Sequence, residues 1–238
     1  MPIARPAPPL CFVLISIYIE NEAPRQRILC EMVQISNDDE PKRRGRPRAY
    51  DPQAALLRAM DAFWKSGYSG TSLDDLSAAT GMNRPSLYAA FGDKRSLYLK
   101  ALAHYWQVAL GAMHADLAEN RPLADSLMRA YEGALAIYFS GEDRARGCFV
   151  VSTAVTEAVE DAEIREGLMT GFLAFDADFE ARFRAAQRNG ELRDDADPAA
   201  LAVIATGVMH TIAIRARSGA TRAALEELAR KAVRALCG

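Results

Sequence analysis

The chain has 238 residues, of which 50% are hydrophobic and 25% charged, and its formal net charge is -2. This balance fits a globular protein of one or two domains with a sizeable core. The four cysteines lack CxxC spacing and the three histidines lack metal-ligand spacing, so neither a metal site nor a disulfide framework is indicated. We therefore expect no metal, no cofactor and a reducing cytoplasm.

The charge is polarised along the chain. Residues 42–102 hold 11 basic and 5 acidic side chains, a balance of +6, whereas residues 103–238 hold 15 and 20, a balance of -5. A basic segment joined to a larger acidic one suggests a polyanion-binding module carried by a body with another role. Exposed helices that merely differ in charge are the alternative.

Residues 1–41 are expected to be a disordered or non-native extension. Their apolar run, LCFVLISIYI at 10–19, is too short to span a bilayer and lacks a following small-residue cleavage site. We expect no membrane association, and we expect translation to begin at Met32, from which a polar tail leads into the basic segment.

Residues 42–49 contain five basic side chains broken by Gly and Pro, which predicts a flexible cationic arm. Beside a DNA-binding domain such an arm can reach into the minor groove, with Arg44 and Arg46 as the side chains that insert. A non-specific tether to phosphates is the alternative.

Two helices are predicted next. The first spans Pro52–Ser66 and ends at Gly67; its apolar side chains recur on one face and are Leu56, Leu57, Met60, Phe63 and Trp64. The second follows a capping-box start formed by Ser72 and Asp75, turns Leu73 and Leu76 inward and stops at Gly81.

A third, very short helix is predicted from Arg84 to about Phe91. Pro85 is tolerated only in a first turn, and Asn83 is suited to cap it. Leu87 and Phe91, four residues apart, form its buried side. Two turns are too few for a stable isolated helix, so its neighbours must hold it. A helix, a turn and a second short helix form the helix-turn-helix arrangement, whose second helix enters the major groove.

The segment GYSGTSLDDLSAATGMNRPSLYAAFGDKRSLYLKAL, residues 67–102, resembles the DNA-binding domain of the TetR family of bacterial transcriptional regulators. The resemblance implies an all-α fold. An N-terminal three-helix helix-turn-helix domain at 50–102 would precede a larger helical ligand-binding and dimerisation domain at 103–238. It further implies a repressor that binds a palindromic operator in double-stranded DNA as a homodimer and is released by a small-molecule effector.

The chemistry of the matched residues supports DNA binding. The fork of Arg84 suits guanine O6 and N7, and Pro85 and Ser86 suit a thymine methyl group. Tyr88 and Lys94 are placed to contact phosphates, and Thr71 and Ser72 are similar to the family's phosphate contacts. The predicted DNA-binding residues are Arg44, Arg46, Thr71, Ser72, Asn83, Arg84, Pro85, Ser86, Tyr88 and Lys94. Singly, each has a structural alternative in solvation, packing or capping. Ala89 and Ala90 replace the bulky side chains common in relatives, which puts the breadth of base contacts in doubt.

The body from residue 103 is predicted to be helical. The helix at 199–215 is apolar nearly all round and must be covered on two sides, and the helix at 221–236 has one apolar stripe. In the resemblance these two helices form the homodimer interface, with Leu201, Ile204, Val208, Ile212, Leu225, Leu228 and Leu236. A monomer whose other helices cover them is the alternative.

The effector pocket is expected among the middle helices. Its candidate lining residues are Trp106, Met113, Cys148, Phe172, Phe175 and Phe179, although aromatic residues at helical spacing equally suit a plain core. Cys148 stands at a helix start near Arg146, a setting that can lower a thiol pKa. The sequence nevertheless favours a buried, inert cysteine over a reactive sensor.

No enzyme is expected. The sequence GYSGT misses the G-x-S-x-G nucleophile elbow by one residue and lies between two helices. The alternative outside transcription is a helical interaction or scaffolding module that binds nucleic acid non-specifically. Only the regulator should protect a palindromic site.

Overall fold

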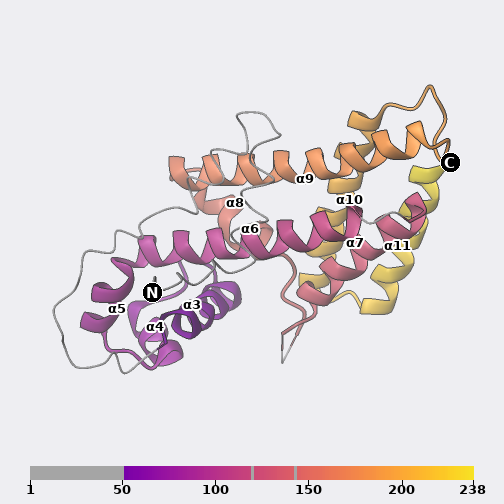
Figure 1. Cartoon of the computed structure of the whole chain (residues 1–238). Helices are drawn as coiled ribbons and strands as arrows, with labels where there is room; N and C mark the ends of the chain where they lie inside the picture. The colour runs from indigo at the N-terminus through magenta and orange to yellow at the C-terminus, as the bar shows by residue number, and fades with distance from the viewer. Residues whose placement is uncertain (1–50, 119–120, 142–143) are drawn as a thin grey trace, which may run out of the picture. The chain divides into compact units, whose positions relative to one another are not determined.

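The computed structural model describes residues 51–118, 121–141 and 144–238. All regular elements in these ranges are α-helices, as predicted (Figure 1). In chain order they are α3 (Pro52–Ser66), α4 (Leu73–Thr80), α5 (Arg84–Phe91), α6 (Lys94–Ala118), α7 (Leu123–Tyr138), α8 (Phe149–Glu157), α9 (Ala162–Arg188), α10 (Pro198–Arg217) and α11 (Arg222–Cys237). The predicted extension, the arm with Arg44 and Arg46, and the start at Met32 lie outside the described residues.

Helix α3 has the predicted bounds. Asp51 Oδ1 accepts the N–H of Gln53 at 2.9 Å to cap its start, and Gly67 ends it at a φ of 78°. The predicted apolar face of α3 included Leu57, but Leu57 is 37% exposed, so the buried face is narrower than predicted. The side chains buried most deeply include Ala55 and Ala59, and Leu57 lies about 200° round the helix from each of them.

Helix α6 joins the helix-turn-helix to the body without an intervening loop. It runs for 25 residues, so the boundary expected between residues 102 and 103 falls inside it. Toward its start, the buried Tyr98 ring meets Phe63 edge-on at 5.2 Å between centroids, and the Tyr98 hydroxyl lies 2.8 Å from Thr153 Oγ1 in α8. The start of α6 therefore packs directly against α3 and α8.

Among the described residues of the body, one cation is buried. Arg182 of α9 lies beside the fully buried Phe183, and it donates to Ser126 Oγ at 3.2 Å and to the carbonyl of Arg121 at 2.8 Å. A Glu191 oxygen lies 3.3 Å away. Because a buried charge is tolerated only with partners, these bonds fix α9 against the start of α7.

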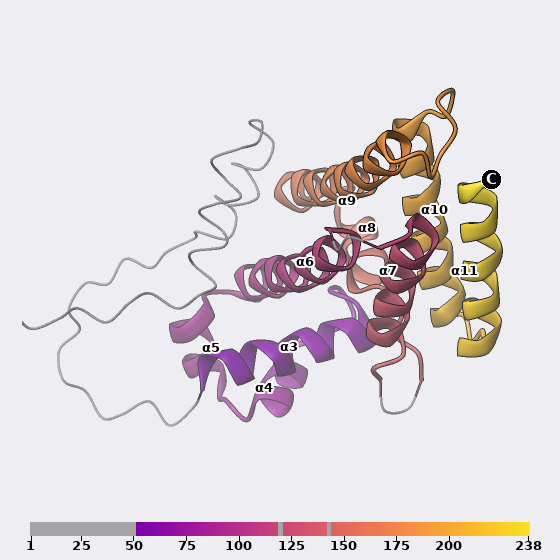
Figure 2. The ribbon, with the colours of Figure 1, turned by 45° about the vertical axis from the view of Figure 1, so that its right-hand side comes forward.

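Helices α10 and α11 lie side by side (Figure 2). Asp197 and Thr221 cap their starts, and the predicted bounds are confirmed to within two residues. By length and composition alone, α10 would be apolar enough to cross a membrane, and 39% of its apolar window is buried inside the protein. The outward side of α10 therefore presents apolar surface.

Candidate nucleic-acid interface and effector cavity

The short helix α5 is held by burial and by caps at both ends. Leu87 and Phe91 are buried. Asn83 Oδ1 accepts the N–H of Ser86 at 2.9 Å, and the N–H of Gly92 donates to the carbonyl of Tyr88 at 3.0 Å. The prediction of a two-turn helix held by its neighbours is confirmed.

The outer side of α5 is open to solvent. Arg84, Pro85, Tyr88 and Ala89 are exposed, and Ser86 is half-buried. Arg84 and Tyr88 are four residues apart, so they stand on the same side of the helix. The side-chain oxygen of Asn83 is engaged in its cap. The contacts of Asn83, Arg84, Pro85, Ser86 and Tyr88 with DNA remain predictions.

Arg84 is already paired across the turn of the helix-turn-helix. Its Nε donates to Asp74 Oδ1 at 3.0 Å, and its Nη2 lies 2.7 Å from both Asp74 oxygens. The two side chains are 54% and 76% exposed. The guanidinium therefore has a fixed partner on α4, and no motif in the sequence predicted that pairing.

Thr71, a predicted phosphate contact, is buried. Its side chain is 1% exposed, and its hydroxyl donates to the carbonyl of Gly67 at 2.6 Å. The predicted phosphate contact from this hydroxyl is therefore wrong, and the group stabilises the turn before α4 instead. Ser72 is exposed and forms the predicted capping box with Asp75, whose pKa is lowered by the Ser72 hydrogen bonds.

Lys94 opens α6 next to its cap. Asp93 Oδ1 accepts the N–H of Ser96 at 2.7 Å, and this bond lowers the pKa of the Asp93 carboxyl. The ammonium of Lys94 lies over the ring of Tyr68, 4.4 Å from its centroid. A cation–π contact of this kind aims the charge without neutralising it. Lys94 remains a predicted phosphate contact.

A cavity of about 30 Å³ lies among α6, α7, α9 and α10. It has room for about two water molecules. Its lining is mostly apolar and comprises Tyr105, Ala109, Ala112, Met113, Asp116, Ala130, Gly133, Ala134, Ile137, Tyr138, Phe175 and Met209. An organic ligand would have to widen this space.

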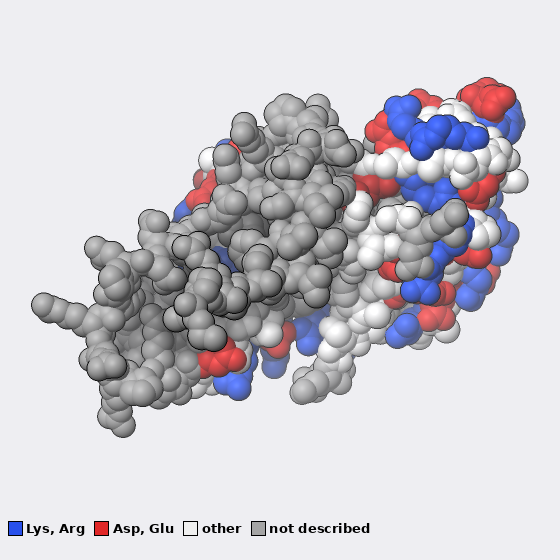
Figure 3. All heavy atoms as spheres, in the orientation of Figure 1, with Lys and Arg blue, Asp and Glu red and all other residues white. Residues whose placement is uncertain are grey.

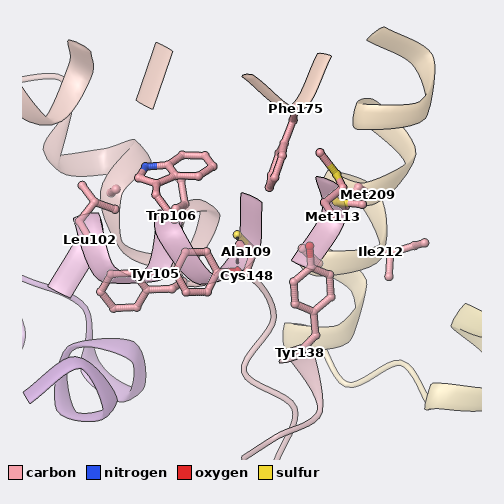
Figure 4. Close-up of a cluster of buried hydrophobic side chains, with 14 of the residues drawn as sticks. Leu102, Tyr105, Trp106, Ala109, Met113, Tyr138, Cys148, Phe175, Met209 and Ile212 are labelled. Carbon is pink, nitrogen blue, oxygen red and sulfur yellow. Dashed lines mark hydrogen bonds between the residues drawn. The ribbon is translucent and has the colours of Figure 1, made fainter. Parts of the chain in front are cut away.

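The polar groups of the cavity are few. In Figure 4 the Tyr138 hydroxyl points toward the space between Phe175 and Met113, and no described residue forms a hydrogen bond with it. Burial raises the pKa of Tyr138 well above its ordinary value, so the phenol stays neutral and can donate or accept. The Asp116 carboxylate lies 3.4 Å from Arg129 Nε.

The predicted pocket residues divide into two groups. Met113 and Phe175 line the cavity as expected, whereas Trp106, Phe172, Phe179 and Cys148 do not. Trp106 fills the space over Gly171, where an added Cβ would lie 2.3 Å from the indole ring. Phe179 packs against Phe183 in the core. Trp106 and Phe179 therefore fill the core beside the cavity and do not line it.

The sequence held an unused signal for this site. Ala130, Gly133, Ala134 and Ile137 of α7 lie at i, i+3, i+4 and i+7, which places small side chains on one face. Such a stripe leaves room beside a packed helix. The lining residues Ala109, Ala112, Met113 and Asp116 of α6 have the same spacing, whereas α9 and α10 contribute one lining residue each, Phe175 and Met209, and show no such stripe.

Cys148 is not a low-pKa thiol. It is 6% exposed, the Tyr105 hydroxyl donates to its Sγ at 3.2 Å, and burial raises the thiol pKa. Arg146 is engaged elsewhere, since it pairs with Asp61 and lies over the Trp64 ring, 4.9 Å from the centroid. The electropositive setting expected from the sequence is therefore wrong.

The predicted dimer residues also divide. Ile212, Leu225 and Leu236 are buried within this single chain, so their assignment to a partner interface is wrong. Ile204 is 54% exposed, and Leu201, Val208 and Leu228 are half-buried. The outward stripe of α10 contains the predicted Ile204 together with the exposed Ala200, Val203, Gly207 and Ile214 and the half-buried Thr211.

Elsewhere the body surface carries both signs of charge. Basic and acidic side chains are interspersed over the described surface at its α9–α11 end (Figure 3). Many are paired, as Arg184 is with Glu180 and Arg222 with Glu226. The face drawn in Figure 3 therefore mixes both signs of charge at this end of the body.

Several polar contacts join the helix-turn-helix to the body. Arg95 of α6 binds Asp161 and Glu163 at the start of α9, at 2.6 and 2.8 Å. Arg217 of α10 donates to the carbonyl of Trp64 in α3 at 3.1 Å. These contacts, with the continuous α6, give a physical route from the body to the DNA-binding end.

Helices α3, α4 and α5 pack into one unit, and α5, the second helix of the helix-turn-helix, is capped and faces outward. This arrangement defines a helix-turn-helix DNA-binding protein. Comparison with known sequences agrees. Residues 56–101 match the family described as "Bacterial regulatory proteins, tetR family", and residues 124–233 match "Tetracyclin repressor-like, C-terminal domain".

Known proteins extend the match to most of the chain. The HTH-type transcriptional repressor ComR of Escherichia coli (strain K12) is 31% identical over 188 residues, which cover 79% of this chain and 90% of that protein. The uncharacterized HTH-type transcriptional regulator YezE of Bacillus subtilis (strain 168) is 30% identical, over 66% of this chain and 81% of that protein.

A solved relative is bound to DNA. A cysteine-substituted form of the TetR family transcriptional regulator CifR, in complex with 26-base-pair operator DNA, is 34% identical. It covers 80% of this chain and 99% of its own, with a TM-score of 0.72. The chain belongs to the TetR family, and it is a DNA-binding transcriptional regulator. Members of this family typically dimerise and respond to ligands.

Proposed function

We propose that this protein is a repressor that binds a palindromic operator as a homodimer and is released when a small molecule enters its body. The observation that carries the proposal is the exposed start of α5, where Arg84, Pro85 and Tyr88 face solvent on a helix fixed by caps and by burial. Two relatives, ComR and BdcR, are named as repressors, which supports repression rather than activation. We place its action in the cytoplasm, and its role is binding rather than catalysis.

In the proposed complex, Arg84 reads a base edge, while Tyr88, Ser72 and Lys94 hold phosphates. A planar guanidinium can bind guanine O6 and N7 together, whereas a hydroxyl or ammonium on the backbone sets register only. Arg44 and Arg46 keep their proposed place in the minor groove. Thr71 contributes to this surface as a buried support.

The dimer is proposed to form through the outward stripe of α10. Val203, Ile204 and Ile214 are all more than half exposed in the single chain, although each is large and apolar. Large exposed apolar patches mark interaction sites. A second copy would cover this stripe by two-fold symmetry, and the half-buried Leu228 of α11 would contribute at its edge.

The effector is proposed to be small and mostly apolar, with one hydrogen-bonding group for the Tyr138 hydroxyl. The walls favour burial of hydrocarbon, and the Tyr138 hydroxyl, which faces the cavity, can form a hydrogen bond with a polar atom of the ligand. Because the cavity is only about 30 Å³, a ligand larger than about two water molecules must displace its walls, which include α6. Such a displacement would reach the DNA-binding end through α6.

Selection from a random DNA library tests the proposed repressor. The full-length protein should enrich a palindrome whose half-sites are separated by about one helical turn or a multiple of it. Retention of DNA without enrichment of any sequence would support the scaffolding alternative. A melting-temperature screen against metabolites should then find a ligand, because a molecule that binds only the folded state raises the melting temperature.

A further inference from the structure

The pairing of Asp74 with Arg84 uses only one edge of the guanidinium. The carboxylate contacts Nε and Nη2, at distances of 2.7 to 3.0 Å. Nη1 forms no hydrogen bond with any residue in the described ranges. Since a guanidinium carries five N–H donors in one plane, its outer edge, made by Nη1 and Nη2, stays available to two further acceptors.

Two acceptors in one plane are what a guanine presents in the major groove. O6 and N7 together accept a bidentate contact from an arginine. An unrestrained arginine loses much rotamer freedom when it binds, and a carboxylate that already fixes the guanidinium plane reduces that loss. We propose that Asp74 is a positioning residue that orients Arg84 toward a guanine and thereby sets the base preference of the operator. This role rests on the proposed reading of DNA by α5.

Other reasons for the pairing are weak. The start of α4 already has its capping box from Ser72 and Asp75, so Asp74 is not needed as a cap. An ion pair this exposed contributes little to folding.

A carboxylate beside a phosphate-binding surface also repels DNA of every sequence. Asp74 therefore lowers affinity for all DNA while raising discrimination, which is a known route to specificity.

A double-mutant cycle separates orientation from charge. Full-length wild type, Asp74→Ala, Arg84→Ala and the double variant are titrated with the selected operator, with each single-base-pair variant of it and with random DNA. Asp125→Ala is the matched control, since Asp125 is also an exposed carboxylate in the first turn of a helix but lies on α7. Melting temperatures check that every variant folds.

In the protein that retains Arg84, Asp74→Ala should reduce discrimination between base pairs at one operator position by about two- to fivefold. In the Arg84→Ala background it should change discrimination at no position. Its gain in affinity for random DNA should be the same in both backgrounds, because that gain comes from charge alone. Asp125→Ala should change neither quantity.

If the wild type selects an operator but Asp74→Ala discriminates between base pairs as well as the wild type does, only the proposed role of Asp74 is overturned. A wild type that selects no sequence would overturn the proposed reading of DNA as well. Equal loss of discrimination in both backgrounds would show that Asp74 acts on the helix rather than through Arg84, which also contradicts the proposal.

Discussion

The helix-turn-helix and the cavity differ in how their functional residues are placed. At the DNA-binding end, the predicted DNA contacts follow one another along α4, α5 and the start of α6. The caps of these three helices, Ser72, Asn83 and Asp93, lie among them. The cavity is lined by residues from four helices, and its side chains meet only when the whole body packs. One site is set by local hydrogen bonds and the other by distant contacts.

This difference suits the two roles. A surface that reads DNA must keep its geometry before binding, because any ordering on binding reduces affinity. A pocket of about 30 Å³ that admits an effector must instead deform. We therefore expect substitutions in the body to divide into those that break the dimer, those that break packing and those that change only the response to ligand.

The largest effect is expected from Ile204→Glu. In the proposed dimer it buries an unpaired carboxylate in each subunit, at a cost of about 3 to 5 kcal/mol per charge. Because Ile204 is 54% exposed, the single chain should still fold. Sedimentation should show monomers with a native helical spectrum, and operator binding should be lost.

Val159→Glu is the matched control, since Val159 is also a large apolar residue, is 72% exposed and lies in the turn after α8 rather than on α10. It should remain dimeric. An intact dimer of Ile204→Glu would mean that the subunits meet through another surface.

Two glycines test the packing of the body. An added Cβ at Gly171 would lie 2.3 Å from the Trp106 ring, so Gly171→Ala should destabilise the protein by about 1 to 3 kcal/mol. Gly111 of α6 has nothing within 4 Å, so Gly111→Ala should stabilise it by about 0.5 to 1 kcal/mol. Urea unfolding measures both. Equal shifts would show that Trp106 moves aside freely.

The cavity can be altered without touching the DNA-binding end. Ala134→Leu should fill it, so that effector no longer releases the operator while operator affinity stays within about twofold, since surface contacts to DNA are unchanged. Tyr138→Phe should weaken effector binding by about 0.5 to 1.5 kcal/mol, the contribution of one hydrogen bond. Calorimetry and operator-release titrations measure these effects. Loss of operator binding in Ala134→Leu would contradict the separation of the two sites.

The smallest effect is expected at the contact between the two regions. Hydrogen bonds from Arg95 lower the pKa of Asp161 to about 2. A folded-state pKa below the ordinary value of about 3.9 means that the pair stabilises the fold above about pH 4 and is lost as the pH falls toward 2. Between these values, wild type should lose slightly more stability than Arg95→Ala. Parallel stability curves in acid unfolding would show that the pair contributes nothing.

Sequence reasoning succeeded where the determinants are local. The caps Ser72 and Asn83, the Pro85 position and the bounds of α3 follow from neighbouring residues, and the structure has them as predicted. It failed where burial depends on distant packing. Ile212 is buried, and Cys148 has a raised pKa, because helices far away in sequence cover them. Thr71 is buried in its own turn, where its hydroxyl donates to the carbonyl of Gly67. The pairing of Asp74 with Arg84 spans ten residues and has no sequence signature.

The central claim is that α5 reads bases while its neighbours hold phosphates, and a comparison of Arg84→Ala with Lys94→Ala tests it most directly. Both variants are titrated with operator and random DNA at several salt concentrations. Arg84→Ala should cost about 1 to 3 kcal/mol on the operator and relax preference at one base-pair position. Lys94→Ala should weaken binding to both DNAs alike and lower the salt slope by roughly one unit per half-site. Equal losses on both DNAs for Arg84→Ala would contradict the claim that this arginine reads sequence.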